Sequence, residues 1–179
     1  MNKIYITCMK YVNQRGFNKE CFNHPHARVM DELSKRALIL AREIFDEEVT
    51  KMINPERTGV VIASNTGPYR ALSEHADILL TSGFKGINPS KFPNTMLSTV
   101  LSRVTKELHL KGPSTAMYID SEESKALEYA VIQIEKGRCD IMAVLVVGEN
   151  RDGFGILLQS EKSLLESNLK ARFYINSLN

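Results

Sequence analysis

The apolar run from Ile141 to Val147 constrains the fold of this chain more than any other feature. Its seven residues (IMAVLVV) leave no polar position on either side of a strand, and such strands are covered on both faces. Before it, Glu122–Lys136 has apolar residues at helical spacing and ends at Gly137, a typical residue just beyond a helix C-terminus. A short strand, Thr115–Ile119, precedes that helix. The strand–helix–strand order predicts an α/β fold with a central sheet.

The same alternation continues through the rest of the chain. We expect four further strands, at Lys3–Met9, Arg57–Ser64, Gly153–Leu158 and Ala171–Ile175. We also expect four further helices, at Asp31–Lys51, Ala71–Leu80, Pro93–Leu108 and Glu161–Leu169. No repeat, linker or low-complexity segment interrupts the pattern, so the sequence predicts a single domain over residues 1–179.

The charge balance argues against nucleic-acid or anionic-membrane binding. The 179 residues include 23 basic and 21 acidic side chains, a net charge of +2, with no basic run or acidic tail. The longest apolar run is too short to span a bilayer, and the first residues lack the apolar core of a signal peptide. Three scattered cysteines, Cys8, Cys21 and Cys139, form no disulfide framework. We therefore expect a cytoplasmic protein that binds neither nucleic acid nor membrane.

Cys21, His24 and His26 (in CFNHPH) come closest to a metal-binding set. Their spacing matches no standard ligand pattern, and no second half of a ligand set is nearby. We expect a loop without metal, and we predict no cofactor. His109 follows the expected helix Pro93–Leu108, where a charge or hydrogen bond at the helix C-terminus is the better interpretation than catalysis.

Six short motifs follow one another along the chain in a characteristic order. They are Arg57–Ile62 (RTGVVI), Asn88–Asn94 (similar to S-P-x-x-x-P), Leu110–Pro113 (L-x-G-P), Ala126–Asp140 (similar to A-I-x-x-A and I-x-x-G-x-x-D), Val147–Glu149 (similar to G-G-x-E) and Gly153–Leu158 (similar to G-A-G-x-x-V-L-E). In order and spacing they resemble the N-terminal half of a β-ketoacyl-acyl carrier protein synthase, a condensing enzyme with the thiolase fold. The resemblance implies a half-thiolase α/β domain, with a mixed central sheet of about five strands and helices packed on it.

Two features of the sequence depart from that family. The family carries T-A-C-A-S-G at the turn after the strand Thr115–Ile119, and the cysteine is its acyl-accepting nucleophile. Here that position falls at Asp120, or at Ser121 if the one-residue gap lies elsewhere, and the turn contains no cysteine. The family's catalytic histidines and lysine belong to a second thiolase-like half that this sequence does not include. The resemblance therefore implies a chain that is not a condensing enzyme on its own.

The residues at this turn suit a helix cap better than a condensing centre. Asp120 is a favoured N-cap residue, and Glu123, three positions on, completes an approximate capping box worth about 1 kcal/mol. An aspartate cannot hold a thioester, and Ser121 would need a nearby base. His75 and His109 are the candidate bases in the matched region.

Three hypotheses of function follow. The first is a non-catalytic ketoacyl-synthase-like subunit in fatty-acid or polyketide-type biosynthesis. Its edge strand Thr115–Ile119 would form a homodimer or a heteromer with a condensing enzyme, and an acyl carrier protein is a further partner. The second is an acyltransferase or thioesterase that uses Ser121 on carrier-protein or coenzyme A thioesters. The third is a module that binds an acyl chain or a carrier protein without turnover, in a pocket with Phe92, Met96 and Met117.

Overall fold

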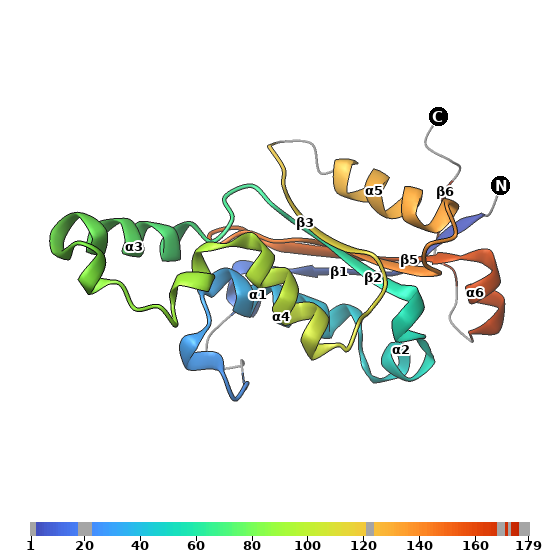
Figure 1. The fold of residues 1–179 in the computed structure, drawn as a ribbon. Helices are drawn as coiled ribbons and strands as arrows, with labels where there is room; N and C mark the ends of the chain where they lie inside the picture. Colours follow the sequence, from blue (N-terminus) through green and yellow to red (C-terminus); the bar gives the residue numbers. More distant parts are fainter. Residues whose placement is uncertain (1–2, 18–22, 121–123, 168–170, 172, 176–179) are drawn as a thin grey trace.

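The computed structural model describes residues 3–17, 23–120, 124–167, 171 and 173–175. These residues form a six-stranded sheet with helices on both faces (Figure 1). The strands are β1 (Ile4–Val12), β2 (Thr58–Ser64), β3 (Ser114–Tyr118), β4 (Ile141–Val146), β5 (Gly153–Ser160) and β6 (Phe173–Ile175). Their order across the sheet is β3-β2-β4-β5-β1-β6.

The sheet is mixed, as the resemblance implies. β3, β2 and β4 run parallel to one another, whereas β5, β1 and β6 each run antiparallel to their neighbours. Five strands have five or more residues, and the three-residue β6 makes a sixth. The predicted α/β class is confirmed.

Helices cover both faces of this sheet. They are α1 (Glu32–Ile44), α2 (Glu47–Met52), α3 (Tyr69–Ser82), α4 (Leu97–Glu107), α5 (Ser124–Glu135) and α6 (Glu161–Glu166). Figure 1 shows α1, α2 and α4 below the sheet, α5 above it, and α3 projecting beyond one end. Within the described residues, none of the helices combines the length and the apolar character that crossing a bilayer requires.

The core consists of two apolar clusters, one on each face of the sheet. Val60 and Ile62 of β2 contribute to the cluster under α1 and α4, whereas Val61 and Ala63 contribute to the cluster under α5. All residues of β2 and β4 are buried. The expectation that the apolar run is a strand covered on both faces is therefore confirmed, because alternate side chains face opposite layers.

Two predicted helix boundaries were wrong. The segment Asp31–Lys51 forms two helices, because Asp46 is extended and its carboxylate accepts a hydrogen bond from the N–H of Val49 at 3.0 Å, which starts α2. Pro93 does not open the next helix either. It lies in the 3₁₀ turn η6 (Phe92–Thr95), and α4 begins only at Leu97.

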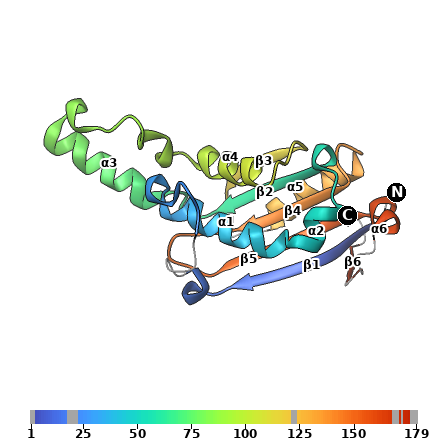
Figure 2. The ribbon, with the colours of Figure 1, turned by 90° about the horizontal axis from the view of Figure 1, so that it is seen from below.

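α3 and residues 83–96, which return the chain to α4, form a projection that we call the α3 arm. Figures 1 and 2 show it extending past the ends of β2 and β3. The returning segment contains a second 3₁₀ turn, η5 (Phe84–Gly86), before η6. Of the 14 residues of α3, only Ala71 is buried. α3 therefore buries little of its surface against the rest of the described chain.

Candidate functional site

The turn after β3 is where the resemblance places the nucleophile. Ile119 is buried, and its N–H donates to the carbonyl of Ser64 at 3.0 Å, which extends the pairing of β3 with β2. Asp120 follows with an exposed side chain. Ser121 and the next two residues lie outside the described residues, and α5 is described from Ser124. The structure thus places Asp120 at the carboxyl end of β3, while the capping box and the role of Ser121 stay predictions.

The carboxyl ends of β2, β3 and β4 meet at this edge, where open α/β sheets commonly hold their sites. The aromatic ring of Tyr118 lies against Gly67, in the turn after β2. Gly67 has a φ of 59°, in the left-handed region that favours glycine, and a Cβ there would stand 2.6 Å from the present position of the ring. Tyr118 itself is 64% exposed. An aromatic ring, and no thiol, is the prominent group beside Asp120.

Glu149 follows β4 at the same edge and is almost fully buried. Its Oε2 accepts a hydrogen bond from the backbone N–H of Arg70 at 2.9 Å, in the first turn of α3. Its Oε1 has no hydrogen-bond partner among the described residues. It borders a cavity of about 110 Å³ lined also by Asn65, Thr66, Tyr69, Asn150 and Arg151. Burial raises the pKa of Glu149, although the Arg70 N–H opposes the shift. This glutamate therefore joins the end of β4 to the start of α3.

Arg36 holds the loop after β4 from the other side. Its Nη1 donates to the carbonyl of Glu149 and its Nη2 to the carbonyl of Arg151 at 2.8 Å. Its guanidinium carbon lies 4.3 Å from the ring centre of Phe17. Burial lowers the pKa of Arg36. Sequence reasoning missed this role, yet the signal was present, since Arg36 falls on the buried side of α1 next to Ala37.

The contacts that the structure describes for the two candidate histidines lie away from Asp120. His75 lies on α3, where its Nδ1 is 2.8 Å from the carbonyl of Ala71 and its ring meets Phe92 edge-on. His109 precedes β3, so it lies at the end of that strand opposite to Asp120. Its φ of 54° is left-handed, and its backbone N–H donates to the carbonyl of Lys106 at 3.3 Å. His109 thus ends α4 through its backbone rather than its side chain.

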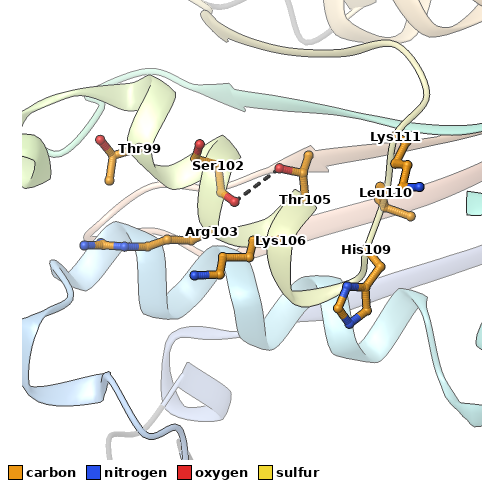
Figure 3. A pocket seen from close by; sticks show the side chains of 8 residues that line it. All are labelled: Thr99, Ser102, Arg103, Thr105, Lys106, His109, Leu110 and Lys111. Carbon is orange, nitrogen blue, oxygen red and sulfur yellow. Dashed lines mark hydrogen bonds between the residues drawn. The ribbon is translucent and has the colours of Figure 1, made fainter. Parts of the chain in front are cut away.

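An open groove of about 460 Å³ runs along α4 (Figure 3). It is lined by Thr99, Ser102, Arg103, Thr105, Lys106, His109, Leu110 and Lys111. Several of these groups are already engaged within the chain. Thr105 Oγ1 donates to the carbonyl of Leu101 at 3.1 Å, and Lys111 pairs with Glu56 at 2.6 Å. The groove lies at the amino end of β3, away from Asp120.

The histidines of the CFNHPH segment border a second cavity, of about 520 Å³, between α4 and residues 24–30. His24 Nδ1 accepts a hydrogen bond from the N–H of His26 at 3.0 Å, and its Nε2 lies 3.3 Å from Glu107 Oε2. Arg42 also pairs with Glu107 at 2.5 Å. Cys21 lies outside the described residues. Across the part of the chain that the structure describes, no three His, Cys, Asp or Glu side chains gather as a metal site would require.

The pocket suggested for an acyl-binding module does not form from the expected side chains. Met117 packs against the core cluster under α5. Phe92 and Met96 lie at the base of the α3 arm, 52% and 41% exposed. Met117 therefore lies apart from Phe92 and Met96.

The sequence matches the family model of the β-ketoacyl synthase N-terminal domain over residues 2–172. The chain therefore belongs to the β-ketoacyl synthase family, as the motifs indicated. No curated protein matches the sequence.

Solved structures of ketosynthases have the same fold. One is the AntDE:AntF structure, a type II PKS acyl-carrier protein in complex with its ketosynthase, with a TM-score of 0.82 and 10% identity over 98% of this chain and 67% of that one. The ishigamide ketosynthase/chain length factor has a TM-score of 0.80 and 16% identity, over 94% and 64%. A β-ketoacyl synthase from Burkholderia phymatum has a TM-score of 0.70 and 13% identity, over 98% and 63%. The chain thus spans about two thirds of the length of these structures.

Proposed function

We propose that this chain is a non-catalytic ketoacyl-synthase-like subunit that works by association in fatty-acid or polyketide-type biosynthesis. The observation that carries this proposal is the residue at the end of β3. The position where the family resemblance requires a cysteine falls at Asp120 or Ser121, and the sequence of this turn contains no cysteine. Condensation needs a thiolate that forms a thioester, and a carboxylate would instead give a mixed anhydride that water hydrolyses readily.

The position of β3 supports association. It pairs with β2 on one side and is the edge strand of the described sheet on the other. Four of its five residues, Ser114–Met117, are only partly buried, and the fifth, Tyr118, is exposed. An open edge of this kind accepts a strand from another chain. The partner is a second copy or a condensing enzyme, with an acyl carrier protein as a further candidate. The ketosynthase/chain length factor complexes among the similar structures are in keeping with a pairing of this type.

A proline in β3 tests the association. The N–H of Ile119 points toward β2, so by the alternation of the strand the N–H of Ala116 points to the open edge. Ala116→Pro removes that donor without breaking the pairing with β2. We expect the variant to keep its circular dichroism spectrum and to lose the partner that wild type retains in affinity purification. Thr115→Ala, on the β2-facing position, is the matched control and should keep the partner.

Acyl-transfer activity of the chain itself would contradict this proposal. Intact-mass analysis after incubation with acyl thioesters of coenzyme A or of a carrier protein should detect no adduct. A covalent acyl adduct that Ser121→Ala abolishes would replace the proposal with the acyltransferase or thioesterase alternative. A wild-type chain that stays monomeric and retains no partner would also refute it.

A further inference from the structure

Two cavities adjoin each other along α4. One is the groove of about 460 Å³ shown in Figure 3, and the other is the cavity of about 520 Å³ beside residues 24–30. Their linings share three residues, Arg103, Lys106 and His109, and all three are basic. In Figure 3 the side chains of Lys106 and His109 extend to the same side of the chain. Basic side chains thus lie at the boundary between the two cavities.

Several charged side chains around these cavities already form ion pairs. The pairs are Arg103 with Asp31 at 2.6 Å, Arg42 with Glu107 at 2.5 Å and Lys111 with Glu56 at 2.6 Å. Among the described residues that line the two cavities, Glu107 is the one acid. Because its carboxylate is paired, any further cation of the lining adds net positive charge, which attracts an anion.

Lys106, His26 and His109 line the larger cavity without such pairing. Within the described residues, no hydrogen bond or ion pair engages the ammonium of Lys106 or the ring nitrogens of the two histidines. The ring of His26 lies 5.7 Å from the ring of His24, and His24 Nε2 lies 3.3 Å from Glu107 Oε2. The wall that carries His26 is therefore packed against the end of α4 that carries Lys106. Three unengaged nitrogen groups border one cavity.

The C-terminus of α4 does not exclude an anion from this place. A helix C-terminus carries a partial negative charge of about half an electron, mainly on its unpaired carbonyls. Here the carbonyls of Val104, Thr105 and Lys106 each accept a hydrogen bond from a backbone N–H, at 3.1, 2.9 and 3.3 Å. The full positive charge of the Lys106 side chain exceeds what remains of the dipole.

The larger cavity also has an apolar wall. Pro25, Val29 and Met30 contribute to its lining, and Val29 is 51% exposed. Sites for small molecules commonly have volumes of about 300–1,000 Å³ and combine apolar walls with a few polar groups that orient the ligand. A cavity of about 520 Å³ with this lining therefore matches a ligand that has one anionic group and one apolar group.

The number of unengaged groups favours phosphate as the anion. A phosphate monoester has three terminal oxygens and a charge of about −1.5 to −2 at neutral pH. A carboxylate has two oxygens in one plane and a single charge. One ammonium and two imidazoles, on two walls of the cavity, can each donate to a different phosphate oxygen.

We propose that this cavity binds a small organic phosphate monoester. The phosphate lies between Lys106, His26 and His109, and the organic group lies against Val29 and Met30. The site borders the segment before β3 and is remote from the turn that follows β3. The inference therefore does not rest on the function proposed above.

A nuclear magnetic resonance titration of the ¹⁵N-labelled full chain with phenyl phosphate tests the proposal. Amides of residues 24–30 and 103–109 should shift saturably, with a dissociation constant of about 1 mM or below, as expected for a ligand of this size. Inorganic phosphate at the same ionic strength should bind about tenfold more weakly, because it lacks the apolar group. Benzyl alcohol should cause no saturable shift, because it lacks the anion.

Charge reversal identifies the residues that hold the phosphate. Lys106→Glu should raise the dissociation constant of phenyl phosphate by about tenfold or more. His26→Ala and His109→Asn should each raise it by about threefold. Asparagine is chosen at position 109 because it tolerates the φ of 54° there. Lys85→Glu makes the same change of charge on an exposed residue of η5 and should have no effect.

Four results would overturn the proposal. They are the absence of saturable shifts with phenyl phosphate, shifts confined to other parts of the chain, equal weakening by Lys106→Glu and Lys85→Glu, and binding of phenylacetate as tight as that of phenyl phosphate. All the variants should keep the circular dichroism spectrum of wild type, because the altered side chains are exposed. Loss of binding can then be assigned to the cavity and not to unfolding.

Discussion

α1 and α3 are amphipathic helices of nearly equal length with opposite outcomes. α1 has 13 residues and buries eight of them, whereas α3 has 14 residues and buries one. α1 packs on the sheet beside α4, whereas the described contacts of α3 are mainly with its own returning segment (Figure 2). An apolar stripe therefore predicts which face of a helix is suited to burial. It does not predict whether the element that packs on this face belongs to the same chain.

The two helices also differ in how they begin. The carboxylate of Asp31 accepts from the N–H of Ser34 at 2.8 Å and pairs with Arg103 at 2.6 Å, which ties α1 to α4. Pro68, at the start of α3, makes no side-chain cap. The N–H of Arg70 is held instead by Glu149, from the loop after β4. One helix is anchored by its own cap and the other by a remote carboxylate.

The largest expected effect comes from truncating a matched leucine in each helix. Leu38 of α1 is fully buried, so Leu38→Ala should lower the free energy of unfolding by about 2–5 kcal/mol through lost burial and a cavity. Leu72→Ala on α3 should change it by less than about 0.5 kcal/mol in the monomer, because the side chain is already in water. Urea unfolding at low protein concentration measures both. Equal losses of unfolding free energy in Leu38→Ala and Leu72→Ala would contradict the difference in burial between α1 and α3.

The next effect is at the caps. Asp31→Ala removes the cap of α1 and leaves Arg103 without its carboxylate, and should cost about 2–4 kcal/mol. The control is Asp46→Ala, which removes a cap of the same geometry from the short and more exposed α2 and should cost about 1 kcal/mol. The same urea titrations apply. A cost no larger at Asp31 than at Asp46 would show that the ion pair with α4 contributes nothing.

The third effect is the dependence of the free energy of unfolding on pH through Glu149, which binds the start of α3. Burial raises the pKa of Glu149 above its ordinary value of 4.5, so the folded chain binds this proton more tightly than the unfolded chain. The free energy of unfolding should therefore decrease as pH rises from about 4.5 through the folded-state pKa. Glu149→Gln keeps an acceptor for the Arg70 N–H and should remove this slope in a pH series of unfolding curves.

A second carboxylate gives the opposite slope and serves as the control. Arg57 forms two hydrogen bonds of 2.9 Å with Asp140 and lowers its pKa below the ordinary 3.8. The stability that this pair contributes is lost as pH falls below about 3.8. This loss of stability at low pH should persist in Glu149→Gln and disappear in Asp140→Asn. A slope above pH 4.5 that survives Glu149→Gln would assign it to another group.

The smallest effect is at two glycines that end helices. Gly83 after α3 and Gly137 after α5 have φ values of 64° and 65°, and a Cβ added at either would meet no neighbouring atom within 4 Å. The backbone conformation alone therefore decides the cost, and alanine is strained at such a φ by about 1 kcal/mol. Gly137→Ala should lower global stability by that amount. Gly83→Ala should instead raise the hydrogen exchange of α3 amides while leaving global unfolding nearly unchanged, because the arm opens separately from the core.

The class of fold and the approximate position of most helices and strands follow from local patterns in the sequence. The run Ile141–Val147 predicted a strand buried on both faces, and β4 with its neighbours confirms it. Helical spacing located α3, α4 and α5 to within a few residues but merged α1 with α2, and the order of motifs identified the family. These succeed because burial imposes a local period, which the sequence records directly. The absence of a cysteine after β3 is also apparent from the sequence alone.

Contacts between residues from distant segments could not be predicted from these local patterns. Arg36, Arg70 and Glu149 come from three separate segments, and their convergence depends on the crossing of β4 beside β2 and on the path of α1. The exposure of the apolar face of α3 could not be predicted either, because its residue pattern is that of a packed helix. The periodic spacing of apolar residues in a sequence indicates that one face of a helix or strand is to be buried. The surface that buries it is set by contacts between distant parts of a chain, or between two chains.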